Sequence, residues 1–301
     1  MINELFASPI DYARLTYLIE KLCEKYPTAH LSYIGNSLLS RQIPMLRIGE
    51  ESAPEVFYIA GHHGCEWLCS GVLLALAREL CELSESGGRI HGISAQYLLR
   101  SRSYTIIPQL NVDGTDIAIN GISPDCPTYA RLTRAAGEGG SSLWQANARG
   151  VDLNHNYDAR FYEYKPLEAE MGLYSAAPSR YSGEYPESEP ESAAVANYIR
   201  YKRPRLILSL HSQGEVIYGG NSAAPRSREI GERLSALCGY ALETPEGAAS
   251  YGGLCDWSAS ELSIPSFTIE CGLGRNPLPL EDGARIYARV RGALLLGASL
   301  V

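Results

Sequence analysis

Hydrophobic residues recur at helical spacing in five long segments of this chain. In the clearest of them, leucine or valine stands at positions 68, 72, 73, 76, 80 and 83, and a Ser-Gly-Gly sequence then ends the pattern. A shorter helix is expected after Asp256. The five predicted helices cover residues 11–25, 66–84, 188–202, 225–238 and 280–298.

Between these helices lie short runs that are apolar at almost every position. Runs of this kind are typical of strands that are buried on both faces of a parallel sheet. Because the strands are separated by helices, the pattern predicts an α/β protein with a mostly parallel sheet covered by helices on both faces. The predicted strands are residues 43–49, 55–61, 104–110, 205–212 and 264–270.

A segment from about residue 111 to 187 interrupts this alternation. It is rich in glycine, serine, proline and tyrosine and has no clear periodicity, and a segment that long is more often functional than idle. No repeat, low-complexity linker or change of composition marks a domain boundary. We therefore expect a single domain over residues 1–301.

Composition narrows the classes of partner. Of the 301 residues, 45% are hydrophobic and 20% are charged, which is ordinary for a globular protein with a sizeable core. The formal net charge of −8 argues against a nucleic-acid partner, because such proteins present a basic face. Basic or zwitterionic substrates fit this charge better.

The expected location is the cytoplasm. The first residues lack the basic start and apolar block of a secretory signal, and the longest apolar runs, such as 293–301, are far shorter than the ~20 residues of a membrane span. None of the eight cysteines forms a CxxC pair, so we expect reduced thiols.

Four polar residues stand at the ends of three predicted strands. His63 and Glu66 follow the strand at 55–61, while His211 and Glu270 close two later strands. Ligands of parallel α/β sheets bind beyond the carboxyl ends of the strands. A single buried histidine is usually a hydrogen-bonded core residue, but four such residues at three strand ends favour a metal site.

Two imidazoles and one carboxylate form a three-ligand zinc site that leaves a position open for water or substrate. Bound zinc lowers the pKa of that water to about 7 and polarises a carbonyl group. A further carboxylate must then take the proton of the water and deliver it to a leaving amine, and Glu270 is the natural candidate. The pattern therefore predicts a hydrolase with one zinc ion per chain.

Five motifs in the same order resemble the M14 zinc carboxypeptidase family, from about residue 10 to 298. The resemblance implies an α/β/α sandwich around a mixed eight-stranded sheet, with His63, Glu66 and His211 as zinc ligands and Glu270 as general base and then acid. The neighbouring His62 is expected to pack or to support the ligands. The motifs are His63-x-x-Glu66 with Trp67, GVDLNHNYD (150–158), LSLHSQG (208–214), GGLCDW (252–257) and FTIE (267–270).

Three positions depart from the family pattern. Peptide carboxypeptidases have Asn-Arg where this chain has Asn154-His155, so the bidentate contact to a terminal carboxylate is missing. The arginine that stabilises the oxyanion in many members aligns with Gln145, and Arg149 is a nearby substitute. The family tyrosine aligns with Ala248, and Tyr251 could supply the phenol instead.

These departures resemble one branch, the γ-D-glutamyl-meso-diaminopimelate peptidases, in residues 144–154, 211–219 and 267–280. Those enzymes cut cell-wall stem peptides between the side-chain carboxyl of D-glutamate and diaminopimelate. Arg275, Asn276 and Glu215 are suited to bind the extra charges of diaminopimelate. The residues expected to contact substrate are Asn154, His155, Gln213, Cys255 and Arg275.

Two other functions stay open on the sequence. One is a carboxypeptidase or deglutamylase that acts on ordinary polypeptides, and the missing arginine at position 155 counts against it. The other is a non-catalytic protein that binds zinc or peptides. The unmatched oxyanion arginine supports this reading, since one such donor contributes ~10²–10³ in rate, but Glu270 argues against it.

Overall fold

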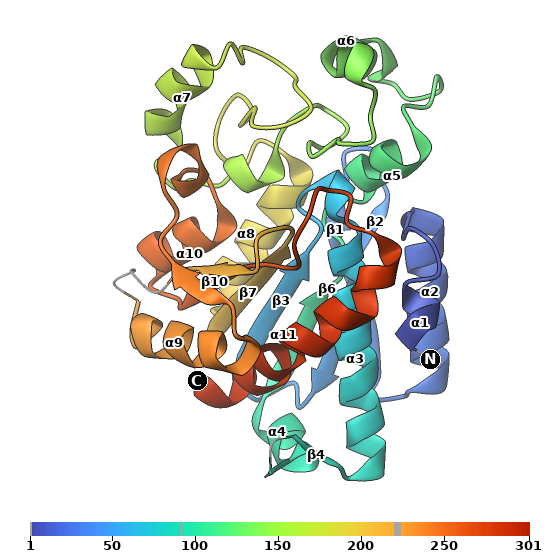
Figure 1. Cartoon of the computed structure of the whole chain (residues 1–301), viewed down its shortest axis with the longest axis vertical. Coiled ribbons are helices and arrows are strands. Elements are labelled where there is room, and N and C mark those ends of the chain that lie inside the picture. The colour runs from blue at the N-terminus through green and yellow to red at the C-terminus, as the bar shows by residue number, and fades with distance from the viewer. Residues whose placement is uncertain (1, 91, 220–223) are drawn as a thin grey trace.

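An eight-stranded sheet forms the centre of the molecule, and the structure, a computed structural model, describes residues 2–90, 92–219 and 224–301 (Figure 1). The strands are β1 (Ala29–Asn36), β2 (Gln42–Gly49), β3 (Glu55–Ala60), β6 (Ser103–Ile107), β7 (Leu206–His211), β8 (Val216–Tyr218), β9 (Ala241–Glu243) and β10 (Ser266–Glu270). Their order in the sheet is β1-β2-β6-β3-β7-β10-β8-β9. Four of the seven pairings are parallel, so the mixed α/β sheet is confirmed.

Two of the inner strands are buried along their whole length. Every residue of β6 and β7 is buried, as expected for apolar runs covered on both faces. Tyr58 and Tyr104 stack in the core with ring centroids 5.9 Å apart, and their hydroxyls donate to main-chain carbonyls of the last long helix. The buried phenols therefore bind the sheet to this helix without leaving a polar group unpaired.

Helices cover both faces of the sheet (Figure 1). On one face α11 (Gly283–Gly297) packs against both α3 (Leu68–Ser86) and α9 (Ser227–Cys238). On the other lie α8 (Pro190–Lys202) and α10 (Leu254–Leu262), where the Arg200 guanidinium sits 4.9 Å from the Trp257 ring. The remaining helices are α1 (Ile2–Leu5), α2 (Tyr12–Lys25), α4 (Ala95–Ser101), α5 (Val112–Asn120), α6 (Tyr129–Ala136) and α7 (Phe161–Glu170).

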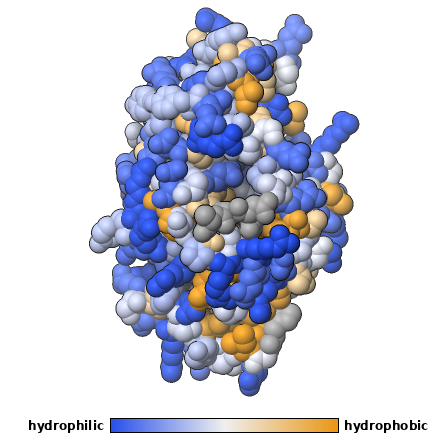
Figure 2. All heavy atoms as spheres, turned by 90° about the vertical axis from the view of Figure 1, so that its left-hand side faces the viewer, coloured by the Kyte–Doolittle hydropathy of each residue, from blue (hydrophilic) through white to orange (hydrophobic). Residues whose placement is uncertain are grey.

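The side of the molecule shown in Figure 2 is predominantly polar. On the face in Figure 2 hydrophilic residues dominate, and hydrophobic residues occur in several small groups. None of the helices within the three described ranges is long and apolar enough to cross a bilayer.

The structure differs from the predicted elements in several places. Residues 111–187 contain α5, α6 and α7, which are too short to show a clear period, and Asn111 caps α5 by accepting from the Gly114 N–H at 2.9 Å. The strands β1, β8 and β9 went unpredicted, because only one of the eight residues of β1 is buried and the other two strands have three residues each. Helix α10 begins at Leu254, so Asp256 lies within its first turn.

Buried acidic residues gather at the start of α8. Asn147 donates from Nδ2 to Glu189 Oε2 at 2.7 Å and to Glu191 Oε2 at 3.3 Å, and Glu191 Oε1 accepts from the Leu38 N–H at 2.8 Å. Burial raises the pKa of Glu191 to about 7, and the charges of Asp113 and Glu189 add to the rise.

Glu191→Gln is expected to stabilise the protein above neutral pH. In the unfolded chain the carboxyl titrates near 4.5, whereas in the folded chain it titrates near 7, so wild-type stability falls as pH rises between these values. At pH 8 the variant should exceed wild type by about 1–3 kcal/mol in free energy of unfolding. Urea unfolding of both metal-free proteins at pH 5 and pH 8 tests this, and an equal difference at both pH values would contradict it.

Candidate metal centre

Three side chains converge at the carboxyl ends of the central strands. The candidate ligand atoms of His63, Glu66 and His211 all lie within 4.8 Å of one another. The distance from His63 Nδ1 to Glu66 Oε1 is 2.9 Å, and His211 Nδ1 lies 3.1 Å from Glu66 Oε2. The two Nδ1 atoms are 3.3 Å apart. Both rings therefore direct the same nitrogen at one carboxylate.

The local backbone explains how these side chains meet. His63 follows β3 and caps a 3-10 turn at Gly64–Glu66, which places its ring and the Glu66 carboxylate on one side of the turn. A side chain at Gly64 would lie 2.3 Å from the Gly114 carbonyl oxygen, so only glycine fits this turn. His211 ends β7, the parallel neighbour of β3, and so its ring lies beside the turn.

Asp152 orients one of the rings. Its Oδ1 lies 3.3 Å from His63 Nε2, and its Oδ2 accepts from the Arg180 N–H at 2.8 Å. Although burial alone would raise it, the pKa of Asp152 is held well below its usual range by the His63 charge and hydrogen bond. A carboxylate on the outer nitrogen fixes the inner nitrogen toward a metal. Asp152 lay within a quoted motif, but its role was not predicted.

The donor set fits zinc. Two ring nitrogens 3.3 Å apart can share only one proton, whereas a divalent cation would satisfy both lone pairs together with the Glu66 carboxylate. Glu66 is 3% exposed and His211 is 1% exposed, so the charge of Glu66 needs a cation close by. Burial lowers the pKa of His63, but Glu66 and Asp152 outweigh burial and raise it well above its ordinary value. Metal binding would displace that proton.

Glu270 stands beside this cluster. It ends β10 and is the register partner of His211 on β7. Burial raises the pKa of Glu270 to about 7, the Glu66 charge adds to the rise, and the two histidines oppose it. A bound divalent cation would lower it again. A carboxyl group that titrates in this range can both accept and return a proton near neutral pH.

A cavity of about 900 Å³ opens over the cluster and Glu270. Four of the predicted substrate-binding residues line it, namely Asn154, His155, Gln213 and Cys255. Arg275 lines an adjoining groove instead. Asn276 lines both spaces, and its Nδ2 donates to Glu66 Oε1 at 3.3 Å. The loop after β10 therefore contacts a candidate metal ligand directly.

His155 does not present a cation to the cavity. Its Nδ1 lies 2.9 Å from the Tyr251 carbonyl oxygen, and its ring stacks on Tyr164 with centroids 4.6 Å apart. Burial lowers the pKa of His155, which keeps the ring neutral. This geometry agrees with the expectation that residue 155 does not make a bidentate contact with the terminal carboxylate of a substrate.

Two of the proposed catalytic substitutes lie elsewhere. Arg149 donates from Nε to Glu189 Oε2 at 3.0 Å and lines a separate small cavity, so it does not reach the metal cluster. The Tyr251 hydroxyl accepts from Arg160 Nη2 at 2.7 Å, and its side chain is not among those that line the main cavity. In this arrangement neither side chain is placed to stabilise an oxyanion.

Two further predicted residues also lie outside the cavity. Glu215 faces Arg285, with 3.9 Å between its Oε1 and an arginine nitrogen, and is not part of the cavity wall. His62 is buried, its Nε2 lies 3.0 Å from the Tyr157 hydroxyl, and its ring stacks on that of His211 with centroids 5.4 Å apart, so it packs against a candidate ligand as expected.

Arg160 and Arg180 line the cavity although sequence reasoning did not select them. Both belong to the segment without clear periodicity, and both have positive φ angles, 54° and 63°. Their side-chain positions depend on the path of this segment over the sheet, for which the sequence offered no local signal.

This chain is similar in sequence to known proteins of one family. A family model described as zinc carboxypeptidase matches residues 15–282. The γ-D-glutamyl-L-diamino acid endopeptidase 1 of Lysinibacillus sphaericus is 32% identical, over 96% of this chain and 72% of its own length.

Solved structures share the fold. Thrombin activatable fibrinolysis inhibitor superposes with a TM-score of 0.77 at 20% identity, over 98% of this chain and 75% of that one. The murein-tripeptide amidase MpaA of Escherichia coli O157 superposes with a TM-score of 0.54 at 20% identity, over 90% of each chain.

Proposed function

Because this chain belongs to the M14 zinc carboxypeptidase family, we propose that it hydrolyses the bond between the γ-carboxyl of D-glutamate and diaminopimelate in bacterial cell-wall peptides. It is a zinc metallopeptidase by family. The observation that carries the proposal is the convergence of His63, Glu66 and His211 beside Glu270 in one cavity. The choice of bond is supported by the relative at 32% identity, which is named as an endopeptidase for the bond between γ-D-glutamate and an L-diamino acid.

In the proposed mechanism His63, Glu66 and His211 hold one zinc ion per chain. When bound, zinc lowers the pKa of a coordinated water to about 7 and polarises the peptide carbonyl. Glu270 accepts the proton of the attacking water and passes it to the leaving nitrogen as the C–N bond breaks. The products are a free γ-carboxylate and the amino group of diaminopimelate.

The neutral His155 supports this substrate over an ordinary polypeptide. A carboxypeptidase needs a fixed cation for the terminal carboxylate, and the ring at this position is uncharged and already engaged by Tyr251 and Tyr164. A stem peptide whose chain continues beyond diaminopimelate has no need of a cation for a terminal carboxylate at this position.

We also propose that residues 1–301 form one catalytic domain that works in the cytoplasm on small peptides. All eight cysteines are free thiols, which supports a reducing compartment. The net charge of −8 supports neither nucleic acid nor an anionic membrane surface as a partner.

Incubation of the purified protein with L-Ala-γ-D-Glu-meso-diaminopimelate tests the proposal. Mass spectrometry should detect L-Ala-D-Glu and diaminopimelate as the products. Ordinary α-linked peptides with free and amidated C-termini serve as controls, and both should remain intact. Removal of C-terminal residues from the free peptide, with the stem peptide uncut, would instead identify a carboxypeptidase.

A further inference from the structure

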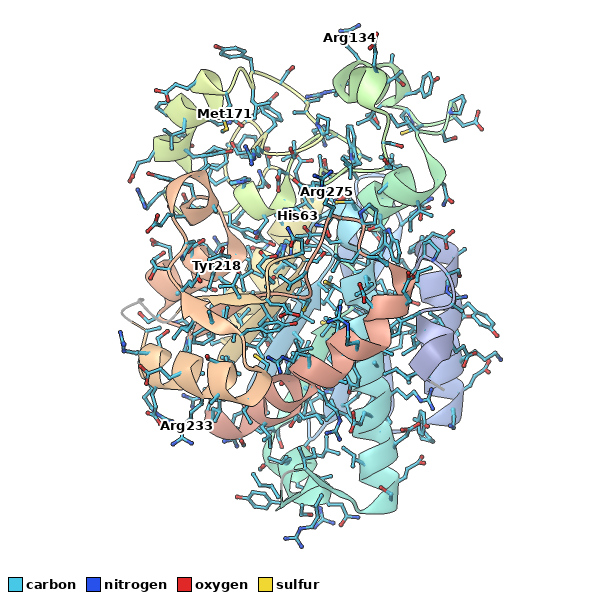
Figure 3. All side chains as sticks on the ribbon, viewed as in Figure 1. His63, Arg134, Met171, Tyr218, Arg233 and Arg275 are labelled. Atoms are coloured by element: carbon cyan, nitrogen blue, oxygen red, sulfur yellow. The ribbon has the colours of Figure 1, made fainter. Side chains whose placement is uncertain are left out.

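A groove of about 900 Å³ continues from the catalytic cavity. The two spaces share Gln145, Arg180, Gln213 and Asn276, so they form one continuous surface. Figure 3 labels two residues of the groove, Arg275 and Met171, and in this view both lie above the carboxyl ends of the strands, with Met171 farther from His63 than Arg275 is. A substrate longer than one residue on each side of the cut could therefore occupy both.

Glu270 fixes which half of the substrate enters which space. Because it passes its proton to the leaving nitrogen, the amine half lies on its side of the cluster. Glu270 and Thr268, two residues apart on β10, both line the main cavity, and neither lines the groove. The diaminopimelate half thus belongs in the cavity, and the acyl half, D-glutamate, in the groove.

The γ-linkage leaves a specific charge on the acyl half. The peptide bond uses the side-chain carboxyl of D-glutamate, so its α-carboxylate stays a free anion a short carbon chain away from the scissile carbonyl. In an ordinary α-linked peptide the α-carboxyl group itself forms the peptide bond, so the acyl residue has no free α-carboxylate. A protein that cuts only the γ-linked bond needs a cation in the groove to recognise this anion.

The groove supplies two such cations. Arg180 and Arg275 are both exposed, and within the described part of the chain neither forms an ion pair with a carboxylate. By contrast Arg149 and Arg160 are paired with Glu189 and Glu163. The one side-chain hydrogen bond of Arg180 in this part of the chain is weak, with 3.9 Å between Nη1 and the Met171 sulfur. Both guanidinium groups are therefore available to a ligand.

Arg180 is also held in place by its backbone. Its N–H donates to Asp152 Oδ2 at 2.8 Å, and its carbonyl oxygen accepts from the Tyr164 hydroxyl at 2.8 Å. The same Asp152 carboxylate contacts His63 through its other oxygen. The arginine backbone is thus fixed relative to the metal cluster, which lowers the ordering cost of binding.

We propose that Arg180 and Arg275 bind the free α-carboxylate of the D-glutamyl residue and so make the protein specific for γ-linked substrates. This inference rests on the proposed γ-D-glutamyl substrate. Guanidinium groups stay charged at all working pH values and form strong charge-assisted hydrogen bonds with carboxylates.

The test compares the acid peptide L-Ala-γ-D-Glu-meso-diaminopimelate with its α-carboxamide, L-Ala-γ-D-isoglutaminyl-meso-diaminopimelate. Wild type should have a kcat/KM about 10- to 100-fold lower on the carboxamide. Arg180→Gln and Arg275→Gln should each lower kcat/KM about 10-fold on the acid peptide and change it little on the carboxamide. Arg134→Gln, an exposed arginine on α6 remote from His63 in Figure 3, is the matched control and should behave as wild type.

The outcomes separate the two proposals. If wild type cuts neither peptide, the proposed function fails. If it cuts both peptides equally fast, or if the two variants lose activity equally on both, the carboxylate contact is overturned while the function stands. Zinc content and thermal unfolding show whether each variant is folded. If Arg180→Gln does not fold, the Arg275→Gln variant and the comparison of the two peptides with wild type still test the proposal.

Discussion

Glu270→Gln is expected to lower kcat by about 10²–10⁴-fold, the range typical of a lost general acid and base. The glutamine keeps the shape of the side chain at the end of β10 but cannot accept the proton of water. Since Glu270 is not a member of the candidate ligand group, zinc content should equal that of wild type. Steady-state hydrolysis of the stem peptide, with metal analysis of the same samples, provides the measurement.

Glu243→Gln is the matched control for this change. Glu243 is an exposed residue at the end of β9, in the same sheet, and its replacement should leave kcat unaltered. If Glu270→Gln turned over at the wild-type rate, Glu270 would not be the proton carrier. A loss of zinc in this variant would instead place Glu270 among the ligands.

Removal of the metal should abolish turnover altogether. Treatment with a chelator is expected to reduce hydrolysis to the background rate, a loss of about 10⁶-fold or more for a typical enzyme, and added zinc should restore it. His211→Ala removes one of three ligands and leaves the buried Glu66 carboxylate with a single imidazole partner. This variant should stay inactive when zinc is supplied.

His30→Ala provides the comparison, because His30 is an exposed histidine on the edge strand β1. It should bind one zinc ion and respond to chelation as wild type does. Persistent activity of the chelated wild-type protein, checked by metal analysis, would exclude a zinc mechanism.

The main strands could be predicted because burial on both faces leaves a strong trace in the sequence. β7 is apolar almost throughout, and its last residue, His211, contrasts with that background. β1 left no such trace, since it lies at the edge of the sheet and only one of its eight residues is buried. Short helices such as α5 depend on a single cap at Asn111 rather than on a long period.

The same reasoning explains which site residues could be predicted. Ligands at strand ends take their positions from the sheet, so His63, Glu66 and His211 could be expected at the carboxyl ends of the strands, and the family resemblance then implied that they bind zinc. Arg149 was chosen because it stands close to Gln145 in the sequence, yet its guanidinium turns toward Glu189. Arg180 reaches the cavity through a hydrogen bond between residues 28 positions apart, which local patterns do not reveal.

The two oxygens of Asp152 serve different partners, the His63 ring and the Arg180 backbone. The Asp152 carboxylate therefore supports a zinc ligand and also positions the loop at Arg180, which lines the groove for the acyl half of the substrate. An engineer who redesigned that loop to accept another acyl group would also disturb the support of a metal ligand. Altered specificity and a firmly held ion would then have to be optimised together.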